Sequence, residues 1–520
     1  MRKEVRKMTS KSIGILVILI IYMLINVLVG VWASKKALKG SVEGGFLQEY
    51  FVGGRTMGGV VLAMTLVATY TSASSFLGGP GLASSWGLTQ CWIAAVQIGT
   101  AFLTLGVIGK KLGIISRRIN AVTISDYLRA RYNSPAVVVL CSVALVVFFI
   151  TQMVAQFIGG ATLIQTVTGL PYAAGLTIFA VVVILYTSVG GFRAVVITDT
   201  IQGFIMAIGT FLMIFFIARA GGGFENLIQQ TAEMNPGWDL LGMGEYGEGV
   251  SGLQPGYLIS FWVLVGVGVL GLPQTAVRGM GFKDTQSLHR AMIYGTVVVG
   301  ILMIGMHFAG VFTLPLLPEG GLDSTDKVIP YVVLNYMPTW AAGLFLAAPL
   351  AAVMSTVDSL LILASATLIK DVYINYFKKR QIEKAKEEGK ELPQKKEGEH
   401  SKVSIYSFAI TAILGVIVFL LAFNPPDIIV WINLFAMGGL EATFFWPLIG
   451  GLYWKKAHSG CCMASIIVGL TVFIFFNRVK IAPFGIHEIV LGLIAGGIAF
   501  FLTGILAKRE PDQEMLDKCF

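Results

Sequence analysis

The chain has 520 residues, of which 55% are hydrophobic and 13% are charged. Because about 25% of the residues in an average soluble domain are charged, this composition excludes an ordinary soluble protein and predicts a polytopic membrane protein. The net charge of +9 does not indicate a nucleic-acid partner, since the basic residues lie in the loops between apolar segments, where they set membrane topology.

Thirteen segments are apolar and long enough to cross a bilayer, which takes about 20 helical residues. The sequence therefore predicts an all-α fold of about 13 transmembrane helices. The predicted spans are residues 13–33, 57–84, 89–109, 136–167, 172–189, 196–218, 256–277, 291–313, 340–369, 403–422, 427–451, 457–476 and 485–507.

The basic residues are distributed unevenly between the two sides of the membrane. The loops that follow odd-numbered spans, together with the C-terminal tail, hold 29 of the 38 Lys and Arg residues. Positively charged loops stay in the cytoplasm, so the count predicts an external N-terminus and a cytoplasmic C-terminus. The basic N-terminal tail argues for the opposite orientation but is outnumbered, and the apolar run after it is too long for a signal peptide.

The second span has a polar middle. It reads YTSASS over residues 70–75 and GGPG over residues 78–81. Glycine and proline weaken a helix interior, and freed carbonyls in hydrocarbon cost several kcal/mol unless something polar takes them up. Two interpretations remain open: a kinked helix whose hydroxyls bond their own backbone, or a break whose carbonyls hold a cation.

The seventh span contains a second interruption by glycine and proline, VGVGVLGLPQTAVR at residues 265–278. If spans 2–6 and 7–11 form two repeats, the interrupted spans are the first of each. Paired broken helices at matching positions in two halves indicate a transporter binding site. An odd number of spans in each repeat also inverts one half relative to the other.

Hydroxyl and acidic side chains lie inside two further spans. Ser355 and Thr356 are adjacent in the ninth span, two residues before Asp358. These hydroxyls either bond back to their own helix or supply oxygen ligands to a hard cation. Asp199 in the sixth span is a functional candidate because of its depth, and the alternative is an ion pair with Arg193.

The other segments are interpreted more simply. Gln152 and Gln156 share a face of the fourth span and either bond a neighbouring helix or face a solute. Residues 374–402 are expected to be a solvated cytoplasmic linker, since they are rich in both charges. The five cysteines have no metal-ligand spacing and are expected to pack as small apolar residues. No catalytic motif is present, so an enzyme is not expected.

Several stretches resemble the sodium:solute symporter family. They are LYTSVGGFRA at 185–194, TDTIQ at 198–202, AAVMST at 351–356 and LASATLIKDVY at 363–373. The similarity covers nearly the whole chain except the basic N-terminus and the charged linker. It implies the leucine-transporter fold. The implied parts are an extra helix and loop (1–56), a first five-helix repeat (57–218), an extracellular loop (219–255), a second repeat (256–451) and two C-terminal helices with a tail (452–520).

The resemblance also implies a sodium site. Its ligands are the carbonyls of Ala68, Thr71 and Ala352 and the hydroxyls of Ser355 and Thr356. The spacing of the last three residues puts them on one side of a helix. Asp199 matches an aspartate that the family places near the exit path of the ion.

The implied function is Na⁺-coupled uptake of a small solute across the plasma membrane by alternating access, with no cofactor besides the coupling ion. Stretches 49–81 and 432–448 are most similar to family members that carry pantothenate. The alternatives are another solute, such as an amino acid like proline, a monocarboxylate or a sugar, and a transporter-like sensor. No Lys or Arg is expected deep in a core span to meet a solute carboxylate. The candidate solute contacts are Tyr70, Ser74, Ser75, Gln90, Gln156, Gln274, Thr275 and Glu441.

Overall fold

The computed structural model describes the whole chain except residues 1–8, 45–54, 235–254, 371–398, 426–428 and 508–512. In the described part, ten helices are long and apolar enough to cross a membrane, and two bent helix pairs each form one further span. Together with the shorter apolar helix over residues Tyr406–Leu421, these elements coincide with the thirteen predicted spans. Residues 235–254 of the expected extracellular loop, and most of the charged linker, lie outside the described residues.

The first half of the chain is helical almost throughout, and its two connected spans 5 and 6 form one segment, α10, that turns at Gly191. The backbone there has φ 64°, a conformation that glycine adopts without steric cost. The elements are α1 (Ser10–Gly44), α3 (Gly59–Tyr70), η2 (Ser74–Gly78), α4 (Gly79–Trp86), α5 (Leu88–Ala95), η3 (Val96–Gly99), α6 (Thr100–Phe102), η4 (Leu103–Gly109), α7 (Lys110–Arg118), α8 (Ile124–Tyr132), α9 (Pro135–Thr168), α10 (Tyr172–Ala220) and α11 (Phe224–Met234).

The second half begins with the other bent span and ends in a short surface helix. Helix α18 begins at Glu399, so the last residues of the expected linker are part of a helix. The elements are α12 (Pro255–Trp262), η5 (Val263–Val267), η6 (Gly268–Gly271), α13 (Pro273–Ala276), η7 (Val277–Met280), α14 (Thr285–Val311), η8 (Leu314–Leu316), η9 (Thr325–Lys327), α15 (Val328–Tyr336), α16 (Thr339–Ala366), α18 (Glu399–Leu421), α19 (Ile429–Tyr453), α20 (Ser459–Val479), η11 (Pro483–Gly485), α21 (Glu488–Leu506) and α22 (Gln513–Cys519).

Two groups of helices pack against each other. In the first, which we call the bundle, α14 packs on α3, α4, α5 and α6. The second bent span belongs to the same group, because its η6, α13 and η7 contact η4, which in turn contacts α6 and α14. In the second, the scaffold, helices α9, α10, α16 and α18 pack on one another. The two groups meet where α3 contacts α10 and α16. Helix α16 is the centre of the molecule, since its most apolar stretch is entirely buried.

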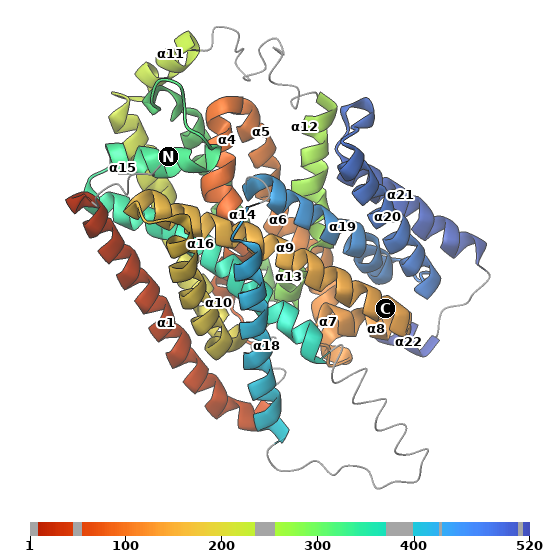
Figure 1. Ribbon diagram of the computed structural model, residues 1–520. Coiled ribbons are helices and arrows are strands. Elements are labelled where there is room, and N and C mark those ends of the chain that lie inside the picture. The colour runs from red at the N-terminus through yellow and green to blue at the C-terminus, as the bar shows by residue number, and fades with distance from the viewer. Residues whose placement is uncertain (1–8, 45–54, 235–254, 371–398, 426–428, 508–512) are drawn as a thin grey trace.

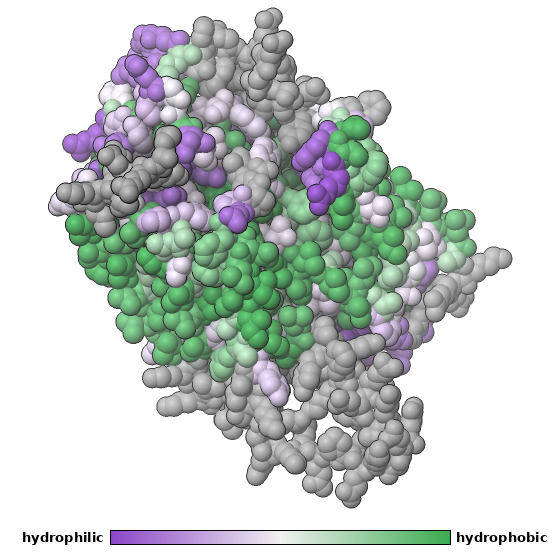
Figure 2. Space-filling model, in the orientation of Figure 1, coloured by the Kyte–Doolittle hydropathy of each residue, from purple (hydrophilic) through white to green (hydrophobic). Residues whose placement is uncertain are grey.

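The surface has the pattern of a membrane protein. Hydrophobic residues form a continuous band across the middle of the face shown in Figure 2, and hydrophilic residues gather at the end that holds α11 and α15. Exposed apolar side chains such as Leu28, Phe211 and Ile505 are those expected to face lipid. Helix α1 begins at the end near α15, whereas α7, α8 and α22 lie at the opposite end (Figure 1).

Candidate cation and solute site

The second predicted span is broken. Its two helical parts, Gly59–Tyr70 and Ser74–Trp86, are bent by 72°. Thr71 is extended, with φ −74° and ψ 133°. The span is therefore not the unbroken kinked helix that was the alternative interpretation.

Two backbone N–H groups that would have continued the first half-helix are diverted at the break. The Ser72 N–H donates to the Ser75 hydroxyl at 3.3 Å, and the Ser75 N–H donates to the Ser72 carbonyl at 3.0 Å. In a regular helix these groups would have bonded the carbonyls of Ala68 and Thr71. Both carbonyls are therefore left for partners from another helix.

The glycines and the proline lie after the break rather than at it. A Cβ at Gly81 would overlap the Thr325 carbonyl, and a Cβ at Gly79 would overlap the His307 ring. Pro80 has no N–H, and the turn before it is a π-helix in which the Gly79 N–H reaches the Ser74 carbonyl. The hydroxyl-rich residues mark the break, and the glycines make room for neighbouring elements.

The partner helix at the break is α16. The Ser355 hydroxyl donates to the Ala68 carbonyl at 2.9 Å and lies 3.1 Å from the Ala352 carbonyl. The Thr356 hydroxyl lies 2.9 Å from both the Thr71 and the Ala352 carbonyls. All five residues are buried. The structure thus brings together the three carbonyls and two hydroxyls that were predicted as sodium ligands, and we call this group the oxygen cradle.

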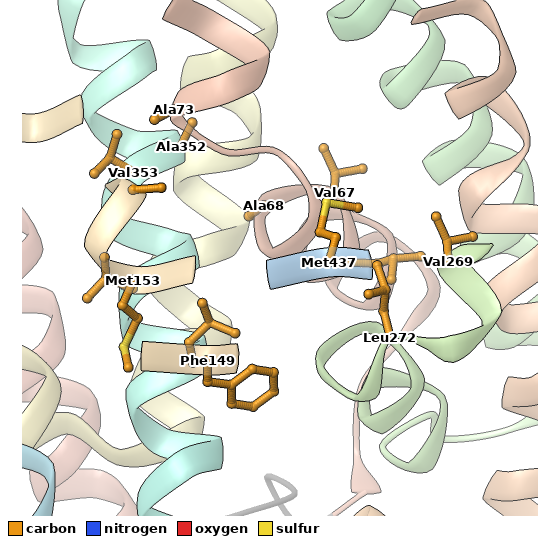
Figure 3. Close-up of a cluster of buried hydrophobic side chains, with 14 of the residues drawn as sticks. Val67, Ala68, Ala73, Phe149, Met153, Val269, Leu272, Ala352, Val353 and Met437 are labelled. Carbon is orange, nitrogen blue, oxygen red and sulfur yellow. The ribbon is translucent and has the colours of Figure 1, made fainter. Parts of the chain in front are cut away.

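Apolar side chains form part of the surroundings of the oxygen cradle. Figure 3 shows Ala68 and Ala73 on either side of the break, with Ala352 and Val353 of α16 beside them. Val269 and Leu272 of the second bent span lie across from Met437 of α19 in the same view. Oxygens grouped inside apolar walls interact more strongly with a cation than the same oxygens in water. A site with no formal charge among its ligands suits a weakly held monovalent ion.

A buried ion-pair network lies one helical turn beyond the cradle. The Arg278 guanidinium donates to the hydroxyls of Thr69 at 2.7 Å and Ser359 at 2.6 Å, and it lies 3.4 Å from the Asp199 carboxylate. Asp199 also accepts a hydrogen bond of 2.7 Å from the Thr65 hydroxyl. Both charged side chains of the ion pair are 0% exposed.

This network also includes a second aspartate, Asp358 of α16, whose carboxylate lies 3.4 Å from the Ser359 hydroxyl. Asp358 accepts a 2.8 Å hydrogen bond from the Tyr186 hydroxyl. The Arg278 guanidinium also stacks 4.7 Å from the ring centre of Phe192. One buried cation is therefore surrounded by two buried carboxylates, and it connects the bundle with α10 and α16.

The expectation that no basic side chain lies deep in the core is wrong. Arg278 follows directly after the predicted seventh span and was counted with the loops, but the second half of that bent span, Pro273–Met280, returns it to the interior. The proposed alternative partner of Asp199, the side chain of Arg193, lies outside the described residues. Arg278 could have been found only by extending the span past the proline break.

A cavity lies beside the break, between α19 and the bundle, of which α14 is part. It is narrow, with a volume of about 60 Å³, below the range of about 300–1,000 Å³ that is usual for small-molecule sites. Four of the eight candidate solute contacts line it: Tyr70, Ser74, Ser75 and Gln90.

A fifth candidate, Gln156, supports the cavity from behind. Its side-chain carbonyl accepts the Ala73 N–H at 2.9 Å, and its amide donates to the Asn433 side chain at 3.4 Å. Asn433 lines the cavity. Gln156 therefore bonds the broken helix itself.

The remaining three candidates do not line the cavity. The Thr275 hydroxyl bonds the Leu272 carbonyl of its own break at 3.0 Å, and Gln274 donates to Gln152 at 3.4 Å. Glu441 is buried against the second bent span. Their side chains are engaged or enclosed away from this cavity, so their role as solute contacts stays a prediction that this geometry does not support.

Other residues of the cavity wall were not singled out from the sequence. Besides Asn433, they include Gln97, which accepts a 3.0 Å hydrogen bond from the Tyr70 hydroxyl. His307 is the most informative addition, because its Nδ1 lies 2.7 Å from the Met303 carbonyl. A carbonyl only accepts, so Nδ1 carries the hydrogen and Nε2 is an acceptor on the side of Gly79. A lone histidine in an apolar helix gave no sequence signal for this role.

Comparison with known proteins places this geometry in context. Residues 50–469 match the sodium:solute symporter family. The sodium/pantothenate symporter of Haemophilus influenzae is 43% identical over 506 residues, covering 97% of this chain and 99% of the relative. The sodium/pantothenate symporter of Escherichia coli K12 is 42% identical over 498 residues, covering 96% and 98%.

Among solved structures, a Na⁺-coupled sialic acid symporter superposes with a TM-score of 0.75 at 19% identity, covering 96% of this chain and 99% of the other. At this identity the likeness concerns the fold. The predicted leucine-transporter fold is confirmed by it, together with the two bent helix pairs.

Proposed function

The chain belongs to the sodium:solute symporter family, and on that premise we propose that it is a secondary active transporter that couples the uptake of pantothenate to that of Na⁺. The choice of solute is supported by the identity of 42–43% to sodium/pantothenate symporters over nearly the full length. The observation that carries the coupling is the oxygen cradle, in which a broken bundle helix and a scaffold helix offer five oxygens to one point.

Na⁺ binds in the cradle in this proposal. The two hydroxyls that now donate to carbonyls rotate, so that their oxygens and the carbonyls of Ala68, Thr71 and Ala352 all point at the ion. Oxygen-only coordination is the chemistry of hard cations. Because Ala68 and Thr71 belong to the bundle and Ser355 and Thr356 to the scaffold, the ion ties the two groups of helices together.

Alternating access follows from this tie. Na⁺ from outside stabilises the arrangement in which the pocket beside the break is ordered for the solute, and the occupied protein then closes. Rocking of the bundle against the scaffold opens the other side, and both ligands leave inward. Asp199 and Arg278 lie between the cradle and the end that holds α7 and α8, so the ion passes them on its way out.

The solute offers two hydroxyls, an amide, a gem-dimethyl group and a carboxylate. The hydroxyls and amide match Tyr70, Gln90, Asn433 and the Nε2 of His307. Arg278 is not among the residues that line the cavity, and its Nη2 donates to Asp199, Thr69 and Ser359, so we do not assign it to the carboxylate. The carboxylate instead faces the N-terminal end of the half-helix that begins at Ser74, where the helix dipole is positive.

Topology and internal symmetry complete the proposal. The end that holds α7 and α8 carries Lys110, Lys111, Arg117 and Arg118, and we place it in the cytoplasm by the positive-inside rule. The N-terminus is then external and the C-terminus cytoplasmic. The two bent spans each open one of two inverted five-helix repeats, over residues 57–218 and 256–451.

Uptake by the purified protein in proteoliposomes tests this proposal. Radiolabelled pantothenate should accumulate when Na⁺ is outside and K⁺ inside, and accumulation should stop when the Na⁺ gradient is collapsed. A large excess of proline, of a monocarboxylate or of a sugar should not compete. Uptake that does not depend on Na⁺ would refute the coupling. Strong competition by proline would refute the assignment of pantothenate as the solute.

A further inference from the structure

Glu441 is a buried carboxylate outside the solute pocket. Its side chain is 0% exposed, and neither of its oxygens has a hydrogen-bond partner in the part of the chain that the structure describes. It lies on α19 one helical turn past Met437, which lines the pocket. It faces the second bent span, where a Cβ at Gly268 would overlap its Oε2 atom. The glycine thus makes room for the carboxylate.

No charged group accompanies this carboxylate among the described residues. Tyr70, on the first bent span, is a titratable side chain near enough to interact with it. Glu488 of α21 borders Leu434, toward the other end of α19. The titratable groups of α8, α9 and α20 gather near Gly451, ten residues or about 15 Å along the helix. They are Tyr127, Arg131, Tyr132, Cys141, Cys461 and Cys462.

A carboxylate enclosed in this way needs a neutralising cation, because an unpaired ion is strongly disfavoured away from water. A metal ion would require several oxygen ligands, and Glu441 is the one carboxylate described at this position, with no hydrogen-bond partner for either of its oxygens among the described residues. The described residues also contain no group of three or more His, Cys, Asp or Glu that could hold a metal. A proton needs only the carboxylate itself.

We propose that Glu441 is a proton-binding site that loads a proton from outside and releases it inside once in each transport cycle. The inference rests on the proposed symport function. Helix α19 packs on scaffold helix α9 and on α20, whereas η6 belongs to the bundle. When the bundle rocks, the second bent span moves off α19 and water reaches the carboxylic acid. Its O–H bond then breaks, the proton passes to water, and the carboxylate is protonated again from outside after the return.

The proton changes the driving force of the cycle. One Na⁺ with one monovalent anion moves no net charge, so the membrane potential contributes nothing. A proton in addition makes the translocated charge +1, and 100 mV then raises the attainable accumulation about fiftyfold. It also removes the repulsion that an ionised Glu441 would exert on an anionic solute.

Proton movement is measured in proteoliposomes that contain a pH-sensitive dye. Addition of Na⁺ and pantothenate outside should acidify the lumen of wild-type vesicles, with about one proton for each solute. Glu441→Gln should abolish the acidification and reduce accumulation at 100 mV by about fiftyfold. Glu488→Gln, on α21, should behave as wild type. Solute uptake without acidification in the wild type, or acidification that survives Glu441→Gln, overturns the proposal.

A second measurement needs no solute. The infrared difference spectrum between the wild type and Glu441→Gln at neutral pH should contain the carbonyl stretch of a protonated carboxylic acid, and that of Glu488→Gln should lack it. An ionised carboxylate band at Glu441 instead overturns the proposal. A Na⁺ Hill coefficient of two in the wild type and of one in Glu441→Gln also overturns the proposal, because it would assign the site to a second Na⁺. Absence of any Na⁺-driven uptake with the acid band present would refute the symport function alone.

Discussion

The two bent spans share a sequence pattern but satisfy their breaks in different ways. At the first break, partners come from elsewhere: hydroxyls of α16 reach the carbonyls of Ala68 and Thr71 at 2.9 Å each, and Gln156 of α9 accepts the Ala73 N–H. The bend there is 72°. The break is held open by polar groups that a cation can recruit.

At the second break, the backbone groups form hydrogen bonds within the same span. The Leu272 carbonyl accepts the Ala276 N–H at 3.1 Å and the Thr275 hydroxyl at 3.0 Å, and the Leu272 N–H reaches the Val269 carbonyl. The bend is smaller, at 50°. Both spans are broken, but a neighbouring helix decides whether the break becomes an ion site. The second span contributes charge instead, through Arg278 and through its contact with Glu441.

Removal of the guanidinium should have the largest effect on folding. Arg278→Met leaves Asp199 and Asp358 buried without their cation, which should cost about 3–5 kcal/mol of stability. The apparent Tm in detergent should fall sharply, and the yield of folded protein should drop with it. Adding Asp199→Asn to Arg278→Met should restore part of the loss.

An exposed ion pair provides the control. Lys327→Met removes the partner of Asp323 in an i, i+4 pair whose side chains are 32% and 73% exposed. Such pairs contribute about 0–1 kcal/mol, so the Tm should hardly change. Equal losses for Arg278→Met and Lys327→Met would contradict the network at the second bent span.

Loss of the cradle hydroxyls should have the largest effect on coupling. Replacing both Ser355 and Thr356 by Ala removes two of the five cradle oxygens, each expected to contribute about 1–3 kcal/mol to cation binding. Each substitution should weaken apparent Na⁺ affinity about tenfold to hundredfold, and the double variant should lose Na⁺ stimulation of uptake. Ser365→Ala is the matched control, since that buried hydroxyl on α16 bonds only its own helix, at Ile362. Unchanged Na⁺ dependence in the double variant would refute the cradle.

The sequence was sufficient for the spans, whose pattern is local, whereas the five cradle residues were predicted from the resemblance to the sodium:solute symporter family. Apolar length defines each span, and the spacing of Ala352, Ser355 and Thr356 fixes a common face of one helix. The solute pocket was predicted only in part. Gln274 belongs to the second break, and its role depends on which neighbour lies within reach, which is decided by tertiary packing.

Arg278 was missed for a related reason. A hydropathy window ends at the first charged residue, but a broken span continues past its proline and carries that charge inward. His307 was missed because nothing local distinguishes a histidine that faces a pocket from one that packs. Both residues become visible only when the two breaks are placed in the same interior.

Substitution of two buried glutamines, one beside each break, compares how much each break contributes to solute binding. Gln156 and Gln274 are 0% and 2% exposed, but Gln156 bonds the Ala73 N–H at 2.9 Å whereas Gln274 donates to Gln152 at 3.4 Å. Gln156→Leu leaves a buried N–H unpaired and should raise the KM for pantothenate about tenfold to hundredfold, or about 1–3 kcal/mol. Gln274→Leu should raise it less than about fivefold. The reverse order would place the solute at the second break.

Substitution of His307 should have the smallest of these effects. It tests whether the solute contacts α14 as well as the first bent span. His307→Phe keeps a ring of similar size against Gly79 but removes the Nε2 acceptor, so one solute hydroxyl loses a partner worth about 0.5–1.5 kcal/mol. The KM should rise about threefold to tenfold, while the maximal rate and the Na⁺ dependence stay unchanged, because the cradle is not touched. His289→Phe, at an exposed position of the same helix, should leave the KM as it is. A change in Na⁺ affinity in His307→Phe would mean that the histidine acts on the cradle through Gly79 and the half-helix, rather than on the solute.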